Sequence, residues 1–127
     1  RVLRAVPVRR PVGTPPPAPG VGRRLTASRP VRIVPSRLLV LTAACLLATV
    51  GHRGAAVETS SFKVAVPELA TWVIDRAMPA YGGMGVSQDT PLPELYAHAR
   101  MLHLADGPDE VHTMAIARRE LRRYPTG

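Results

Sequence analysis

Asp106 is the residue whose position most directly offers acid–base chemistry. It lies in the segment Leu104–Glu110, where Gly107-Pro108 interrupts the chain just before a run with helical periodicity. An Asp at a helix entrance usually caps the first N–H groups and stabilises the helix by about 1 kcal/mol. The same carboxylate serves as a general base where it faces a substrate cavity. The residue types alone favour the cap over the base.

A second turn, Gly82-Gly83-Met84-Gly85, offers backbone chemistry instead of side-chain chemistry. Glycines have no Cβ, so they allow another molecule to approach the backbone closely and leave N–H groups exposed toward an anion. This turn follows a helical pattern, whereas the dinucleotide-binding fingerprint follows a strand. Taken alone, the turn therefore indicates only a place of close approach.

Other catalytic and metal-binding patterns are missing from the sequence. There is no Ser-His-Asp order, no HExxH motif and no GxGxxG after a predicted strand. His98 and His103 are five residues apart, a poor spacing for one helical face, so no metal site is predicted. Cys45 stands in an apolar run and is expected to be a buried, inert thiol.

Helical periodicity predicts the elements that position the two turns. Residues 55–77 form one helix, which Pro67 is expected to kink or split, and a shorter helix runs from an Asp89-Thr90-Pro91 start to about His103. A final helix runs from about Pro108 to Tyr124. The predicted inward faces are Phe62, Val66, Leu69, Val73 and Ala77 on the first helix, Leu92, Leu95, Tyr96, Ala99 and Leu102 on the second, and Val111, Met114, Ala117 and Leu121 on the last.

The run from Arg37 to Val50 is apolar on nearly every side. It has fewer than the roughly 18 apolar residues that a membrane-spanning helix needs, so no membrane span is expected. A secretory signal is a rival interpretation, with Arg29 to Arg37 as its basic part. A helix buried in a core or a subunit interface is favoured. Because no strand pattern is present, the fold class is predicted to be all-α, an antiparallel helical bundle.

The formal net charge of +8 is distributed unevenly along the chain. No Asp or Glu precedes Glu58, and residues 1–57 contain ten Arg and no Lys. Residues 1–30 combine this basicity with dense Pro and Gly, so they are predicted to be a disordered segment, with the helical domain in residues 31–127. A nucleic-acid-binding arm through Arg9-Arg10 and Arg23-Arg24 is an alternative, but no aromatic residue is interleaved for base stacking.

Both turns resemble the carboxy-terminal helical domain of acyl-CoA dehydrogenases. The residues that carry the resemblance are Gly82, Gly83, Gly85, Pro91 and Arg100, together with the turn LADGPDEVH at residues 104–112. Most of that family has a Tyr-Glu-Gly-Thr turn there, and the match is to the subgroup that writes ADGPDEVH. The resemblance covers about residues 32–123.

The resemblance implies an FAD-dependent oxidation of acyl-CoA to 2-enoyl-CoA. Asp106 is then the base that removes the α-proton, while the β-hydrogen leaves as hydride to the flavin. Gly82 and Gly83 would approach the adenosine diphosphate part of FAD bound to a neighbouring subunit, and Gly107 and Pro108 would line the flavin and substrate side of their turn. Pro79 departs from the family pattern, because a glutamine that helps to hold FAD usually stands there.

The family's amino-terminal helical domain and middle β-domain have no counterpart in this sequence. The chain is therefore expected to be a fragment that is inactive alone. As part of a complete enzyme its partners would be acyl-CoA, an electron-transfer acceptor and further copies in a dimer or tetramer, without nucleic acid. The compartment would be cytoplasmic in a bacterium and mitochondrial in a eukaryote. A noncatalytic helical interaction module that associates through residues 37–50 is the alternative from another functional class.

Overall fold

The computed structural model describes the backbone of residues 19–124 and the side chains of Ser28 and residues 30–124. Within that part of the chain the elements are four α-helices and one 3-10 helix, with no strand. They are α2 (Pro19–Gly54), α3 (Ala56–Ala77), η1 (Pro79–Val86), α4 (Leu92–Met101) and α5 (Asp109–Leu121). The predicted all-α helical bundle is confirmed.

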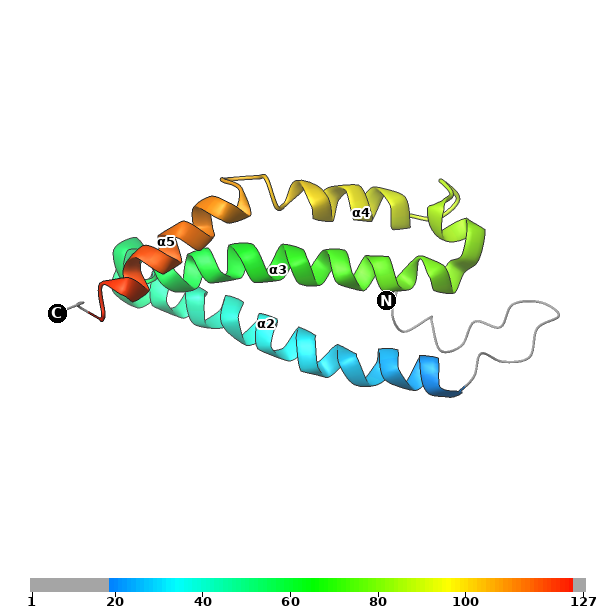
Figure 1. The fold of residues 1–127 in the computed structure, drawn as a ribbon, viewed down its shortest axis with the longest axis horizontal. Helices are drawn as coiled ribbons and strands as arrows, with labels where there is room; N and C mark the ends of the chain where they lie inside the picture. Colours follow the sequence, from blue (N-terminus) through cyan, green and yellow to red (C-terminus); the bar gives the residue numbers. More distant parts are fainter. Residues whose placement is uncertain (1–18, 125–127) are drawn as a thin grey trace.

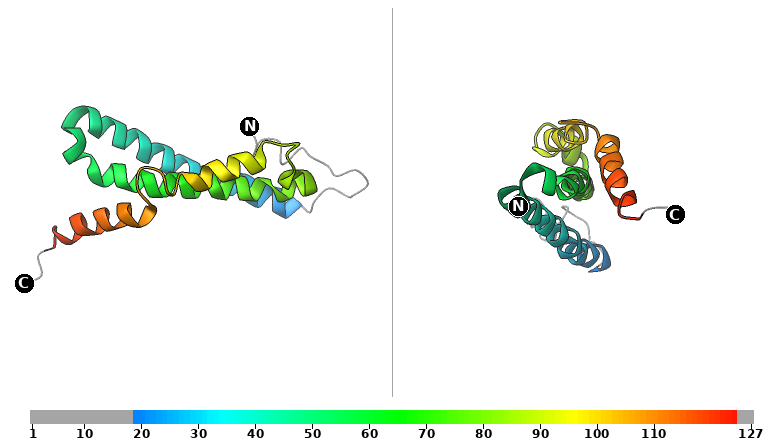
Figure 2. Two further views of the ribbon diagram at one scale, coloured as in Figure 1. Left: turned by 90° about the horizontal axis from the view of Figure 1, so that it is seen from above. Right: turned by 90° about the vertical axis from the view of Figure 1, so that its left-hand side faces the viewer.

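α3 lies at the centre of the bundle, and the other elements pack around it (Figure 1). α2 runs antiparallel along one side of α3, while α4 and α5 follow one another along the other side in the reverse direction. Seen along the bundle, α2, α4 and α5 occupy three different positions around α3 (Figure 2). This arrangement places the α4–α5 turn over the middle of α3 and η1 at its carboxy-terminal end.

The start of α2 differs from the prediction. The helix begins at Pro19, so residues 19–30 are helical where a disordered segment was predicted; residues 1–18 lie outside the described part of the chain. Pro30 and Pro35 lie inside this helix, and both are exposed. Each removes one N–H donor, but the carbonyl freed by an exposed proline can bond to water. A Pro-containing stretch can therefore stay helical at the surface.

The corner between α2 and α3 is made by Gly51, whose φ of 71° and ψ of −177° leave the helical region. Ala55 follows it and is completely buried, which lets the two helices approach closely. α3 then continues for 22 residues through the buried Pro67, so the predicted split of this helix is wrong. Arg32 of α2 stacks over the ring of Trp72 in α3 at 4.5 Å, a cation–π contact between the two helices.

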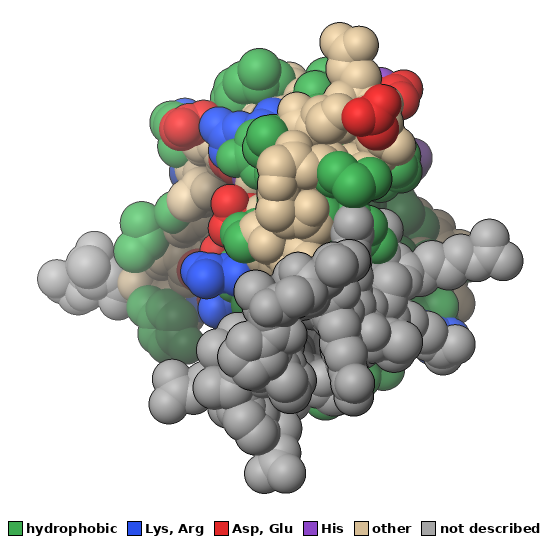
Figure 3. All heavy atoms as spheres, turned by 90° about the vertical axis from the view of Figure 1, so that its right-hand side faces the viewer, with side chains coloured by type: hydrophobic (Ala, Val, Ile, Leu, Met, Phe, Trp, Pro, Cys, Tyr) green, Lys and Arg blue, Asp and Glu red, His purple; other side chains and the backbone are tan. Residues whose placement is uncertain are grey.

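Small residues make most of the fully buried core. Apart from Leu92, the buried hydrophobic residues of the described chain are alanines: Ala43, Ala55, Ala77 and Ala99. Larger apolar side chains reach the surface, and at the η1 end of the molecule they lie among charged ones (Figure 3). The helices therefore contact one another mainly through small side chains and leave many larger apolar side chains exposed.

α5 is rotated relative to the prediction. Val111, Met114, Ala117 and Leu121 were expected to face inward, but all four are exposed. The half-buried side chains of α5 are instead Asp109, His112, Ile116, Arg119 and Glu120. At the start of the helix, the half-buried Asp109 bonds to His103 of the α4–α5 turn. The apolar side of α5 is therefore left uncovered in the described part of this chain.

α2 carries an exposed apolar surface. Pro30–Gly54 is long and apolar enough to cross a membrane, by length and composition. Its 18-residue window has a mean hydropathy of 2.0, and 6% of that window is buried. By length and composition α2 is thus a candidate membrane span, which residues 37–50 alone do not indicate, because the helix extends beyond that run. Cys45 is exposed, not buried as predicted, since α2 meets α3 on one side only. Core helices of soluble proteins and signal sequences near the N-terminus pass the same test of length and hydropathy.

Candidate active site

The turn between α4 and α5 holds two consecutive residues in the left-handed region of backbone space. Asp106 has a φ of 57° and Gly107 a φ of 105°. Asp is among the few non-glycine residues that adopt this conformation at modest cost. Backbone hydrogen bonds fix the approach to the turn, because the N–H groups of Leu104 and Ala105 both donate to the Met101 carbonyl, at 2.9 and 3.0 Å. The residue types at positions 106 and 107 therefore match the local backbone.

The Asp106 side chain is not a helix cap. The cap position of α5 is Pro108, and no side chain makes a capping bond there. The Asp106 carboxylate is instead 87% exposed, and its Oδ2 accepts a hydrogen bond from Lys63 Nζ at 3.1 Å. The same ammonium group donates to the Ala105 carbonyl at 3.2 Å, so Lys63 of α3 holds both the backbone and the side chain of the turn. The cap interpretation is wrong, and the carboxylate is displayed outward.

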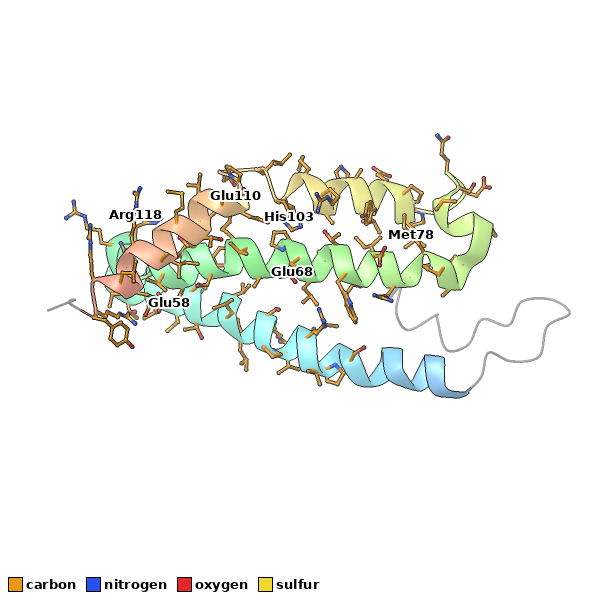
Figure 4. The ribbon with its side chains drawn as sticks, viewed as in Figure 1. Glu58, Glu68, Met78, His103, Glu110 and Arg118 are labelled. Atoms are coloured by element: carbon orange, nitrogen blue, oxygen red, sulfur yellow. The ribbon has the colours of Figure 1, made fainter. Side chains whose placement is uncertain are left out.

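A chain of three polar side chains lies under the turn. His103 Nδ1 is 2.5 Å from Asp109 Oδ2, and His103 Nε2 is 3.3 Å from the Thr71 hydroxyl of α3. Figure 4 shows His103 between the α4–α5 turn and α3. Local sequence patterns do not indicate this group, because Thr71 is far from the turn in sequence and the spacing of His98 and His103 bears only on metal binding. The short His103–Asp109 spacing around a Gly-Pro turn is the one signal that could have indicated it.

This hydroxyl, imidazole and carboxylate have the order of a hydrolytic triad, but their setting does not suit that chemistry. Thr71 is half-buried in the middle of α3, where neighbouring backbone N–H groups are used in helical hydrogen bonds. A triad also needs free N–H donors to stabilise an oxyanion. The group is therefore a structural support for the turn.

The three glycines of η1 have different surroundings. A Cβ added at Gly82 or Gly83 would meet no atom within 4 Å, whereas one added at the buried Gly85 would overlap the Met78 backbone, 2.8 Å from its carbonyl carbon. Gly82 also has a φ of 59°. Gly85 is therefore required for packing within the fold. The open backbone at Gly82 and Gly83 fits the close approach of an external group such as a cofactor.

We expect Gly85→Ala to destabilise the fold and Gly83→Ala to leave it unchanged. The Cβ at position 85 has to displace backbone, which costs about 1–3 kcal/mol in the free energy of unfolding. At position 83 there is open space, so a change within about 0.5 kcal/mol is expected. Urea denaturation followed by circular dichroism measures both variants. Equal stabilities would contradict this division of roles.

The two turns lie at opposite ends of α4. This helix has 10 residues and is about 15 Å long, and each turn lies beyond one of its ends. The structure thus brings Asp106, Gly107 and Pro108 together and keeps Gly82 and Gly83 apart from them (Figure 1). A single small group cannot contact both turns. Among the described residues, no set of three or more His, Cys, Asp or Glu side chains could hold a metal ion.

Comparison with protein-family models matches residues 3–121 to "Acyl-CoA dehydrogenase, C-terminal domain". The chain belongs to the acyl-CoA dehydrogenase family. The match begins at residue 3, so the prediction that the resemblance starts near residue 32 is wrong. The beginning of α2 is therefore part of the family domain, in agreement with its helical structure.

Several acyl-CoA dehydrogenases are similar to this chain over part of their length. Human acyl-CoA dehydrogenase family member 11 is 52% identical over 86 residues, which cover 68% of this chain and 11% of that protein. The probable acyl-CoA dehydrogenase FadE2 of Mycobacterium tuberculosis is 41% identical over 104 residues, covering 82% of this chain and 26% of that protein. The structure of a putative acyl-CoA dehydrogenase from Mycobacterium abscessus superposes with a TM-score of 0.88 at 44% identity, covering 98% of this chain and 31% of that one.

Proposed function

We propose that this chain supplies the carboxy-terminal helical part of an FAD-dependent acyl-CoA dehydrogenase, with Asp106 as the catalytic base. The observation that carries the proposal is the Asp106 turn, which displays a carboxylate outward at a left-handed position that no capping role explains. A carboxylate held on a short, bonded turn is suited to remove a proton from a substrate placed against it. The substrate class would be acyl-CoA thioesters and the product 2-enoyl-CoA.

In this proposal each residue of the turn has a task that follows from its position. Asp106 takes the proton from the carbon next to the thioester carbonyl, and Lys63 donates hydrogen bonds to the carboxylate and to the Ala105 carbonyl. Gly107 has no side chain, so Asp106 remains accessible, and Pro108 fixes the start of α5. FAD, when bound, supplies the acceptor for the hydride that leaves the β-carbon.

The glycine turn is proposed to contact a different part of the cofactor. Gly82 and Gly83 offer backbone with open space around it, and the whole of α4, about 15 Å long, lies between them and the Asp106 turn. That separation suits the adenosine diphosphate end of an extended FAD molecule, or FAD on a neighbouring subunit. Pro79 is the first residue of η1 and has no N–H group to donate. It therefore cannot replace the side-chain bond that a glutamine would make to FAD.

The chain is proposed to be inactive without further polypeptide. It spans about a tenth of the human relative and 31% of the Mycobacterium abscessus structure. A chimera tests this proposal. Residues 19–124 of this chain would replace the matching segment of the Mycobacterium abscessus protein. We expect the chimera to reduce its flavin with acyl-CoA and the isolated chain to form no enoyl-CoA, as followed by enoyl absorbance. A chimera that folds, binds FAD and still fails to form enoyl-CoA would refute the proposed function.

A second candidate function is self-association through α2, as in the oligomers expected for the complete enzyme. The exposed apolar residues of α2 include a stripe with the spacing of a coiled-coil seam, three and four residues apart in alternation. Its members are Val31, Val34, Leu38, Leu41 and Cys45. An uncovered apolar stripe of this length is typical of a protein interface. An electron-transfer acceptor would be a further partner of the complete enzyme.

We expect the double variant Leu38→Glu/Leu41→Glu to shift the chain toward the monomer. Each leucine is more than half exposed. Burying one at an interface contributes about 1.5–3 kcal/mol to the free energy of association, so the double variant should raise the dissociation constant at least roughly tenfold. Sedimentation velocity over a range of concentrations measures the shift. The control is Leu104→Glu/Leu121→Glu, which adds the same charge at two exposed leucines outside α2. A wild-type chain that is monomeric at every concentration would rule out this interface.

A further inference from the structure

We propose that His103 is a positioning residue that sets the orientation of the Asp106 carboxylate. The inference rests on the proposed function in one respect only, the role of Asp106 as the base. The supporting observations are the hydrogen bonds of His103 under the turn, which go to Thr71 and Asp109 and not to Asp106 itself. His103 and Asp109, which bracket the turn, are joined twice, and His103 is also tied to the central helix.

The double junction closes the turn into a ring. The Asp109 N–H donates to the His103 carbonyl at 3.2 Å, and the His103 ring bonds through Nδ1 to the Asp109 carboxylate at 2.5 Å. The backbone bond and the side-chain bond therefore link the same two residues across the five that separate them. We call this pair the His103–Asp109 clasp. It fixes the distance between the ends of the turn, and so the path of the backbone through Asp106.

The second ring nitrogen docks the clasp on α3. His103 Nε2 lies 3.3 Å from the Thr71 hydroxyl, and the His103 side chain is 14% exposed. A neutral ring that donates from Nδ1 to Asp109 accepts at Nε2 from the Thr71 hydroxyl. A protonated ring donates to both partners, so the three-residue chain holds in either protonation state. Hydrogen bonds at such a sheltered site contribute more to the free energy than bonds in water.

Lys63 cannot hold the carboxylate in place by itself. Its ion pair with Asp106 involves a carboxylate that is 87% exposed, and pairs of this kind are weak and screened by salt. Asp106 also occupies a left-handed backbone position, from which the chain relaxes unless its surroundings hold it. The clasp is the sheltered part of the turn, whereas the Lys63 bond is the solvated part. The orientation of the Asp106 carboxylate therefore depends on His103.

Hydrogen exchange on the 127-residue chain tests the clasp without any cofactor. The reporter is the Asp109 amide, which donates to the His103 carbonyl. In His103→Ala we expect this amide to exchange about tenfold faster or more, as for the loss of a bond to a charged group. The amides of α3 should keep their protection. Unchanged exchange at Asp109 would overturn the proposal.

A second measurement reads the Asp106 carboxylate itself. The carboxyl carbon resonance of Asp106 and its proximity to the Lys63 ammonium, followed by NMR, should change in His103→Ala and in Thr71→Val. Thr71→Ser keeps the hydroxyl and should restore the wild-type values. If His103→Ala unfolds the chain, the comparison of Thr71→Val with Thr71→Ser tests the inference instead. Identical resonances of Asp106 and Asp109 in these two variants would overturn it.

These tests of the His103–Asp109 clasp are independent of the proposed function. Since neither readout needs flavin or acyl-CoA, the clasp can be established or refuted even if Asp106 proves not to be the base. Conversely, an Asp106→Asn chimera with full activity would remove the catalytic role of that residue. It would leave the effect of His103 on the turn as measured.

Discussion

Asp106→Asn is expected to lower the turnover of the chimeric acyl-CoA dehydrogenase by about 10²–10⁴-fold, the contribution typical of a positioned general base. Asn is the right substitution because it adopts the left-handed conformation as readily as Asp. Its amide oxygen can still accept the Lys63 hydrogen bond. The fold and the turn are therefore preserved, and the variant removes only the ability to take a proton. Steady-state enoyl-CoA formation and the rate of flavin reduction in a single turnover measure the loss.

Two further variants test whether the loss of turnover in Asp106→Asn comes from the loss of the base at this position. Asp75→Asn neutralises another exposed carboxylate, which lies 3.9 Å from Arg76 on α3, and should leave turnover unchanged. Asp106→Glu keeps the charge but lengthens the side chain by one methylene, so it should retain part of the activity with a lower kcat, because base placement matters to within about 1 Å. An Asn variant as active as the Asp75 control would exclude Asp106 as the base.

The sequence was sufficient to predict the helices and the two turns, because each has a local cause. Apolar residues three and four apart indicate α3, α4 and α5, and Gly-rich or Gly-Pro segments indicate where the chain reverses. The positions of Asp106, Gly107 and Pro108 within one short turn follow directly from adjacency. Features of this kind need no knowledge of which segments meet in space.

Other features depend on tertiary contacts and were not predictable from local patterns. The side of α5 that carries Asp109 is half-buried and bonds to His103, whereas the apolar residues Val111 and Met114 face outward. Lys63 and Thr71 belong to α3, and only the fold brings them to the turn. The helical start of α2 does not follow from composition, because dense proline usually indicates disorder although exposed prolines can be accommodated in a helix.

The exposure of α2 and α5 bears directly on the chemistry. A dehydrogenase has to hold its base and substrate in a site from which water is excluded. In this chain the Asp106 carboxylate and much of the apolar surface are open to solvent. The faces that are exposed here are those that further polypeptide would cover. The Asp106 turn is thus preformed in this chain, and the proposed function requires that further polypeptide enclose it.

The isolated chain is accordingly expected to purify without stoichiometric flavin. Small-molecule sites are usually enclosed pockets of about 300–1,000 Å³ that bury most of the ligand. One groove, between α2 and α3 and lined by Arg32 and Glu68 among others, has a volume of about 220 Å³ and includes no residue of either turn. The glycine turn and the Asp106 turn are separate and solvent-facing, so neither can bury an FAD molecule. Few of the contacts that would hold the cofactor are therefore available.

Absorbance between 350 and 500 nm, measured after expression with added riboflavin and gel filtration, checks this expectation (the wavelengths span roughly the flavin bands). The chimera, prepared in the same way, is the control and should retain about one flavin per chain because its other domains complete the site. A flavin-loaded isolated chain would show that the exposed turns bind FAD unaided or through copies of themselves. Gly83→Ala would then distinguish the two turns, because it leaves the fold intact and should release flavin only if the glycine turn contacts it.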